Sequence, residues 1–152
     1  MRYQIVAIGG PKRGFYVEGC HFFIKRLGNY ASVDLVELKE ARAKDAGRVQ
    51  EQESERLLSA AQHYLVALDE GGKSFSSRQL AARLSALELR GDSAVSLLIG
   101  GAEGHSDALK EKANELWRLS DLTLPHELAR LVLLEQLYRA ETIRAGHPYH
   151  RE

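Results

Sequence analysis

The end of the chain concentrates groups that could do chemistry, in the segment His147-Pro148-Tyr149-His150-Arg151-Glu152. A tail of this kind offers a base in His150, a stacking surface in Tyr149 and an anion clamp in Arg151. The spacing of His147 and His150 is also compatible with a metal ion. No Cys or carboxylate cluster at ligand spacing lies beside them, so we expect no metal site.

A second candidate group is a pair of opposite charges in an apolar setting. Glu135 and Arg139 stand four residues apart, in the order that favours pairing on a helix. Charges kept among apolar residues form either an interfacial ion pair or part of a functional site. Both interpretations stay open.

Two glycine-rich segments could approach a ligand closely. Gly100-Gly101-Ala102-Glu103-Gly104 directly follows the apolar run Ala94–Ile99, and the carboxyl ends of parallel strands line ligand crevices. The spacing is not that of a dinucleotide fingerprint, and a plain tight turn explains it equally well. Gly71-Gly72-Lys73-Ser74 lacks the first glycine of a P-loop because position 67 is Ala. We expect a turn that leaves a strand there.

The segment Leu119–Leu124 is a further candidate for the wall of a ligand pocket. It alternates apolar with small polar residues. It offers apolar contact together with free backbone groups, as a flat heterocycle such as adenine requires. An ordinary junction between a strand and a helix is the alternative.

The elements that must position these groups alternate between strands and helices. This order predicts an α/β fold with a mainly parallel sheet and helices on both faces. The expected strands are Tyr3–Ile8, Val33–Leu38, Tyr64–Leu68, Ala94–Ile99 and, shorter, Trp117–Leu119. The expected helices are Gly14–Leu27, Arg48–Ala61, Ser77–Leu89, a segment from near Ser106, and one that starts at Pro125 and stops at Gly146.

Local signals refine these elements. Gly28 and Asn29 predict a left-handed cap for the first helix, and Ser77 is the expected N-cap of the third. The charged stretch Lys39–Glu55 predicts a surface loop that leads into an exposed helix. Cys20, the only cysteine, lies in an apolar run and is expected to be a buried, unreactive thiol.

The length and composition indicate one globular domain over residues 1–152, with 44% hydrophobic and 28% charged residues. The 21 cations balance the 21 carboxylates, so no overall field attracts nucleic acid. Any polyanion must therefore be met locally, and residues 1–30 carry five cations against one carboxylate. A solvated basic helix face explains this local excess at least as well. No apolar run approaches the roughly 20 residues of a membrane span and no leader precedes the first strand, so we expect a cytoplasmic protein.

The last helix predicts an assembly. One sheet face in a small domain should cover only one stripe of a helix, yet apolar residues surround nearly all of this one. A second copy of the chain would bury the remainder, so we expect a homodimer. The apolar residues are Leu128, Ala129, Leu131, Val132, Leu133, Leu134, Leu137, Tyr138 and Ala140.

Four segments in order resemble the RlmH family of ribosomal RNA methyltransferases: Leu97–Gly104, Leu122–His126, Glu135–Ala140 and His147–Glu152. The resemblance covers essentially the whole chain. It implies an α/β-knot (SPOUT) fold with a C-terminal trefoil knot, and a homodimer that uses S-adenosylmethionine. The implied reaction is methylation of N3 of a pseudouridine in 23S rRNA on the assembled ribosome.

The chemistry of this reaction suggests roles for the remaining candidate groups. We expect His150 or a nearby basic group to assist deprotonation of N3, and Arg151 or Arg139 to stabilise the developing anion. Tyr149 would position the base, and Glu135 would accompany Arg139. Whether the tail acts within its own subunit or across the dimer stays open. The alternatives are a SPOUT methyltransferase of another RNA and a non-catalytic ribosome-binding module. The implied cofactor contacts are Leu68, Gly100, Gly101, Gly104, Leu119, Ser120, Asp121, Leu122, Thr123 and Leu124.

Overall fold

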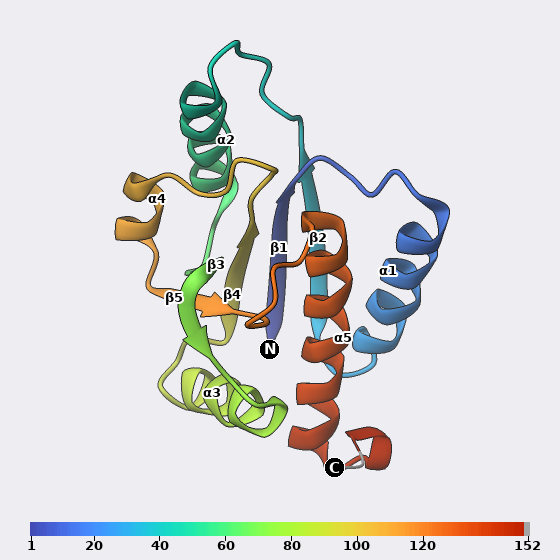
Figure 1. Ribbon diagram of the computed structural model, residues 1–152. Coiled ribbons are helices and arrows are strands. Elements are labelled where there is room, and N and C mark those ends of the chain that lie inside the picture. The colour runs from blue at the N-terminus through green and yellow to red at the C-terminus, as the bar shows by residue number, and fades with distance from the viewer. Residues whose placement is uncertain (151–152) are drawn as a thin grey trace.

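A five-stranded parallel sheet in the order β2-β1-β4-β3-β5 forms the centre of the molecule (Figure 1). The computed structural model describes residues 1–150, without the side chain of His150. The predicted α/β class is confirmed. The strands are β1 (Arg2–Ile8), β2 (Ser32–Leu38), β3 (Tyr64–Ser74), β4 (Ala94–Ile99) and β5 (Glu115–Arg118).

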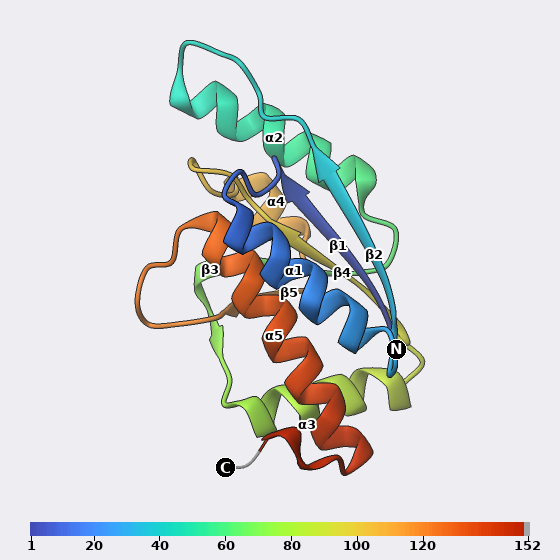
Figure 2. The ribbon, with the colours of Figure 1, turned by 90° about the vertical axis from the view of Figure 1, so that its right-hand side faces the viewer.

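Helices cover both faces of this sheet, as predicted. α1, α3 and α5 pack on one face, and α2 and α4 pack on the other (Figure 2). Within residues 1–150 no helix is long and apolar enough to cross a membrane. The helices are α1 (Gly14–Leu27), α2 (Ala46–Ala60), α3 (Ser77–Leu89), α4 (Asp107–Lys112) and α5 (His126–Ala145), followed by the 3-10 turn η1 (Pro148–His150).

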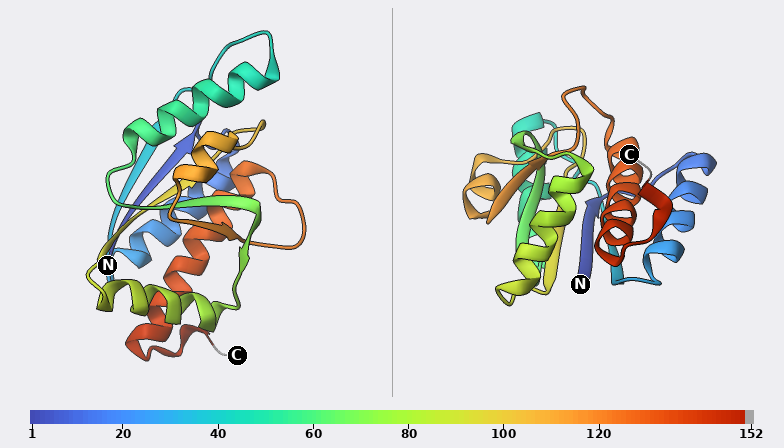
Figure 3. Two further views of the ribbon diagram at one scale, coloured as in Figure 1. Left: turned by 90° about the vertical axis from the view of Figure 1, so that its left-hand side faces the viewer. Right: turned by 90° about the horizontal axis from the view of Figure 1, so that it is seen from below.

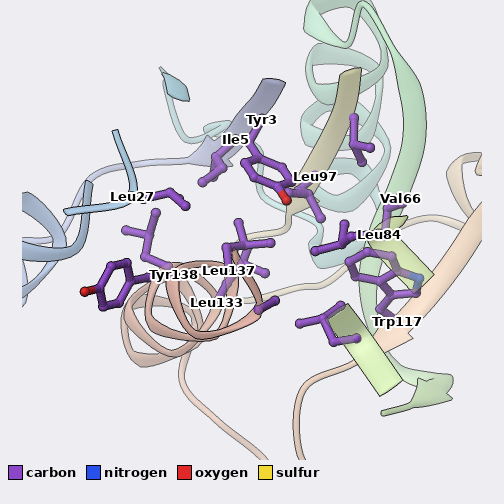
Figure 4. Packing of buried hydrophobic residues seen from close by; sticks show 14 of the residues in the cluster. Tyr3, Ile5, Leu27, Val66, Leu84, Leu97, Trp117, Leu133, Leu137 and Tyr138 are labelled. Atoms are coloured by element: carbon purple, nitrogen blue, oxygen red, sulfur yellow. The ribbon is translucent and has the colours of Figure 1, made fainter. Parts of the chain in front are cut away.

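The alternation of side chains along β1 divides the core between the two faces. Tyr3 and Ile5 point to the side of α1, α3 and α5, where they meet the leucines of α5 (Figure 4). Val6 and Ile8 point to the opposite side, where they pack with Leu57 of α2. Because both faces are covered, nearly every residue of β1 is buried.

Helix α5 lies between α1 and α3 on its face of the sheet (Figure 2). Gly19 allows α1 to approach closely, since a Cβ there would lie 2.8 Å from Cδ1 of Leu131. The premise that the sheet alone covers α5 is therefore wrong, because the two flanking helices bury most of its apolar circumference within one chain. The homodimer stays a prediction that now depends on the resemblance.

A polar network fixes the second half of α5. The hydroxyl of Tyr3 donates to Oε2 of Glu141 at 2.5 Å, and Nη1 of Arg144 lies 2.8 Å from Oε1 of the same carboxylate. Arg144 also pairs with Glu88 of α3. Burial and the Glu141 carboxylate raise the pKa of Tyr3, so the phenol stays a neutral donor that joins β1 to α5.

Strand β3 is longer than the sequence indicates. The turn expected at residues 71–74 is wrong, because the strand pairs again with β5 there, with Lys73 opposite Trp117 and Ser74 opposite Arg118. Trp117 also faces Leu68, so residues 69–72 leave the ladder as a bulge. Within this bulge the amide of Gly71 donates to Oδ2 of Asp69 at 2.9 Å.

The local signals were partly right. Cys20 is 3% exposed and burial raises its pKa, which confirms an unreactive thiol. Gly146 ends α5 with φ 74°, as expected of a left-handed cap. The left-handed cap predicted at Gly28 is wrong, since its φ is −59°. Helix α3 is capped by Ser76 and not by Ser77, because Ser76 and Gln79 form a reciprocal capping box.

Candidate active site

A cleft of about 990 Å³ opens beside the carboxyl end of β4. Three stretches of chain form its walls: the glycine loop at residues 100–105, the β3 bulge at residues 69–71, and the segment at residues 117–126 that joins β5 to α5. The place agrees with the general rule that ligands of open α/β sheets bind beyond the carboxyl ends of the strands. It is large enough for a ligand of cofactor size.

The glycine loop requires its small residues. Gly104 has φ +73°, a left-handed conformation that other residues adopt with strain, and its amide donates to the carbonyl of Gly101 at 3.1 Å. A Cβ at Gly101 would lie 2.8 Å from Oε1 of Glu53, a carboxylate that is 3% exposed. The loop can therefore keep this tight form only with glycine at both positions.

Helix α2 supports the glycine loop from behind. Nε2 of Gln50 donates to the carbonyl of Glu103 at 2.8 Å, and Oγ of Ser54 accepts from the amide of Ser106 at 2.9 Å. Glu53 and Ser54 are buried. The expectation that this charged stretch is an exposed helix is wrong at these two positions, because their polar groups bond to neighbouring loops.

The junction between β5 and α5 forms the second wall of the cleft. Of the expected residues 119–124, Asp121 does not line the cleft. Its carboxylate is 83% exposed and pairs with Arg118 at 3.2 Å. Leu122 is 77% exposed and so offers a large apolar surface to a ligand. The junction residues that do line the cleft are Leu119, Ser120, Leu122, Thr123 and Leu124, joined by Leu68, Gly100, Gly101 and Gly104 from elsewhere.

The third wall contains residues that sequence reasoning missed. Asp69 and Glu70 come from the β3 bulge, and Oδ1 of Asp69 pairs with Nζ of Lys110 at 3.3 Å. The signal was present in the Gly71-Gly72 pair, since glycines within a strand often mark a bulge. Because Lys110 balances Asp69, Glu70 is the carboxylate that gives this wall a negative charge suited to a cationic ligand.

His105 adds a hydrogen-bond acceptor to the cleft. Its ring is 4% exposed, and burial lowers its pKa, so the imidazole is neutral. Nε2 lies 3.3 Å from the carbonyl of Leu98, which requires the proton on Nε2 and leaves a lone pair on Nδ1. Nδ1 has no hydrogen-bond partner among the described residues, and it lies beside Gly100.

These residues fit an adenosine-type cofactor. Leu68, Leu119 and Leu124 offer apolar contact, the glycine loop leaves room for close approach to its backbone, and the unpaired Nδ1 of His105 can accept a hydrogen bond. Such a combination of apolar walls with a few polar groups is typical of cofactor sites.

The described part of the predicted catalytic tail, up to Tyr149, does not line the cleft of its own subunit. The cleft touches only the first turn of α5, whose 20 residues span about 30 Å, and η1 lies beyond the other end of that helix (Figure 3). His126 and Ala129 line the cleft, whereas Tyr149 does not. The side chain of His150 and all of Arg151 lie outside the described residues.

Tyr149 instead contacts the Glu135–Arg139 pair. Nη2 of Arg139 lies 2.5 Å from Oε1 of Glu135, so the two side chains form an ion pair, and its place in an interface or in a site stays open. The hydroxyl of Tyr149 donates to the same oxygen at 3.2 Å, and the guanidinium stacks 5.0 Å from the centre of the Tyr149 ring. Burial, followed by the Glu135 carboxylate, raises the pKa of Tyr149. Three of the predicted catalytic residues thus form one cluster.

Within residues 1–150, no three His, Cys, Asp or Glu side chains come together in a way that could hold a metal ion.

A parallel sheet with a glycine loop and a second loop around one cleft is typical of α/β proteins that bind a ligand beyond the carboxyl ends of their strands. Residues 1–150 match the family described as "Predicted SPOUT methyltransferase", and the chain belongs to this family of enzymes.

Curated relatives identify the branch of that family. A protein of Deinococcus radiodurans named "Ribosomal RNA large subunit methyltransferase H" is 44% identical over 152 residues, which covers 99% of either chain. A protein of the same name from Thermus thermophilus is 43% identical over 151 residues, again 99% of either chain. The resemblance to the RlmH family is thereby confirmed.

A solved structure supports the fold alone. A probable methylase family protein from Haemophilus influenzae superimposes with a TM-score of 0.57 at 12% identity, covering 99% of this chain and 70% of that one.

Proposed function

We propose that the protein uses S-adenosylmethionine to methylate N3 of a pseudouridine in 23S rRNA on the assembled ribosome, and therefore acts in the cytoplasm. The observation that carries the proposal is the cleft between the glycine loop and residues 119–124 in a chain of the SPOUT family. The names of its relatives point to large-subunit ribosomal RNA as the substrate.

The cofactor would lie along the cleft, with its adenine against Leu68, Leu119 and Leu124. When bound, S-adenosylmethionine supplies an activated methyl group on a sulfonium. The carboxylate of Glu70 faces the same cleft and favours this positive charge. Nδ1 of His105 would accept a hydrogen bond from a donor group of the cofactor.

The remaining task of the protein is to prepare the nucleophile. N3 of pseudouridine carries an imide hydrogen, and its anion delocalises onto two carbonyl oxygens. In our proposal His150 takes this proton, while Arg151 or Arg139 stabilises the anion. The bound sulfonium would supply the methyl group to N3 and would leave as a neutral thioether that keeps the electron pair of the broken carbon–sulfur bond. Tyr149 keeps its proton because of its raised pKa and positions the base as a donor.

The described part of the tail and the cleft of one subunit lie at opposite ends of α5, which supports a site built from two chains. We propose that the protein is a homodimer in which the tail of each subunit completes the cleft of its partner. The trefoil knot of the C-terminal segment, which the resemblance implies, also stays a prediction.

Transfer of labelled methyl groups to ribosomes that lack the modification tests the reaction. We expect transfer to these ribosomes, none to modified ribosomes, and none to transfer RNA. Label on transfer RNA alone would favour a SPOUT methyltransferase of another RNA. Binding of ribosomes without transfer, combined with no cofactor binding by calorimetry, would favour the non-catalytic module.

A mixing experiment tests the shared site. Gly101→Val closes the glycine loop against Glu53, and His150→Ala removes the proposed base. If the site is shared, each variant is inactive alone. After unfolding and refolding together, half of the dimers contain one intact site of two, so about a quarter of the wild-type activity should return. No return of activity, with mixed dimers shown by mass spectrometry, contradicts a shared site.

A further inference from the structure

A second cavity, of about 850 Å³, contains a cluster of basic side chains. We call it the basic pocket. Its walls come from the loops that follow β1 and β2 and from the outer face of α2. Its lining residues are Gly9, Lys12, Lys39, Glu40, Ala41, Arg42, Gln52 and Arg56.

The four cations of the basic pocket are exposed, and no ion pair within residues 1–150 neutralises them. Glu40 is the single carboxylate in the lining. Nη1 of Arg56 donates to the carbonyl of Lys39 at 2.7 Å, which holds that guanidinium at the wall. A chain with no net charge therefore presents a local excess of three positive charges at this place.

The chemistry of the lining favours phosphate groups over bases. None of the lining residues is aromatic, so the pocket offers no surface on which a base could stack. Exposed Lys and Arg side chains contact the phosphates of nucleic acids without reading the sequence. The matching ligand is a sugar–phosphate backbone.

The basic pocket lies at the same end of the sheet as the cofactor cleft. β1 pairs with β4, and Ala7 of β1 faces Ile99 of β4 (Figure 1). Neighbouring strands lie about 5 Å apart, so the loops that begin at Gly9 and Gly100 start within about 10 Å of each other. The basic pocket and the cleft are therefore formed by loops at the same edge of the sheet.

One buried carboxylate links the two sites. Oε2 of Glu53 accepts from the amide of Ala41 at 3.0 Å, in the wall of the basic pocket. Oε1 has no hydrogen-bond partner among the described residues and faces Gly101 in the wall of the cleft. The same side chain thus bonds to the loop of the basic pocket and lies against the glycine loop of the cleft.

We propose that the basic pocket binds the phosphate backbone of the substrate RNA beside the target nucleotide, and so positions the nucleotide over the cofactor cleft. The inference rests on the proposed function for the identity of the RNA. Lys39 and Arg42 are the cations best suited to a test, since no hydrogen bond or ion pair is recorded for either side chain within the described residues.

The test compares the double variant Lys39→Gln/Arg42→Gln with the control Arg2→Gln/Lys25→Gln, which removes two exposed cations at the opposite end of the sheet. Binding to ribosomes that lack the modification is measured over a series of salt concentrations. We expect the double variant to bind about tenfold more weakly, with a salt slope smaller by between about 1 and 2, and the control to match the wild type. In methyl transfer, KM for ribosomes should rise while kcat and cofactor affinity stay unchanged.

Unchanged ribosome affinity and salt slope in the double variant would refute RNA binding by the basic pocket, even if the wild type transfers methyl groups fully. An equal loss in the control would refute it too, since the effect would then belong to total charge. If the double variant binds ribosomes more weakly than the wild type, as expected, but the wild type transfers no methyl group, the proposed function is refuted and the basic pocket is not.

Discussion

Gly72 provides the sharpest test of the geometry of β3. An ideal Cβ at this position would lie 2.6 Å from the carbonyl carbon of Leu116 and 2.7 Å from that of Trp117. Carbon atoms prefer separations of about 3.5–4.0 Å, so the contact is about 1 Å too short. Both contacts are with backbone atoms of β5, which cannot rotate away as a side chain could.

Gly72→Ala should therefore destabilise the protein through overpacking. The clash can be relieved only by separating β3 from β5, where Lys73 pairs with Trp117. We expect the free energy of unfolding to fall by about 2–3 kcal/mol, at the upper end of what overpacking costs. For a chain of this length the midpoint temperature should fall by about 4–12 °C. Because β5 leads into the cleft wall at residues 119–124, cofactor affinity should fall as well.

Urea unfolding followed by circular dichroism measures this effect, at one fixed protein concentration because assembly would alter apparent stability. Two glycines serve as controls. A Cβ at Gly14 meets nothing within 4 Å, so Gly14→Ala should change stability by less than about 1 kcal/mol, in the stabilising direction. A Cβ at Gly71 meets only the movable carboxylate of Asp69, at 3.1 Å. A Gly72→Ala variant as stable as Gly71→Ala would show that the close approach of β3 to β5 is wrong.

Two further predictions concern a cap and a buried ring. Ser76→Ala removes the capping box of α3 and should cost about 1 kcal/mol, whereas Ser77→Ala should cost less; equal losses in urea unfolding would contradict the assigned cap. For His105, burial lowers the pKa in the folded protein below the roughly 6.5 of the unfolded chain, so its protonation favours unfolding. The stability that this neutral ring contributes is fully present above about pH 6.5 and is lost as the pH falls from there toward the lower folded pKa, by at most about 1.4 kcal/mol per pH unit. Relative to a His105→Leu variant, the wild type should thus lose stability as the pH falls below about 6.5, and a constant difference would contradict a buried neutral imidazole.

The sequence predicted the regular elements well where a single local pattern decides them. The apolar run Ala94–Ile99 predicted both ends of β4 correctly, and helical spacing predicted both ends of α1 at Gly14–Leu27. Both elements pack against several neighbours that reinforce the local preference. The same local approach failed at Gly28, where the helix ends with a cap in right-handed conformation.

The site was predictable where it depends on glycines and not where it depends on long-range packing. The glycine loop was expected at the end of β4 because strand ends form crevices. The β3 bulge was missed, because only the distant partner β5 makes residues 71–74 a strand. The role of Glu53 was missed for the same reason, since its partner Ala41 and its neighbour Gly101 lie in two separate loops.

The separation of the tail from the cleft also could not be read from sequence. Composition indicates that both segments carry chemistry, but only the straight course of α5 sets them about 30 Å apart. The burial of α5 between α1 and α3 was likewise a property of the assembled layers, as the contact of Gly19 with Leu131 illustrates.

The bulge in β3 allows ligand binding to be followed by hydrogen exchange. Amides that leave a ladder exchange their hydrogens with solvent more readily than those on either side of them. Residues 69–72 stand between two paired stretches of one strand and border the cleft, so their exchange can be followed against an internal reference in the same peptide. A molecule that settles in the cleft would slow deuterium uptake at these four positions, and thereby report occupancy without any label on the ligand.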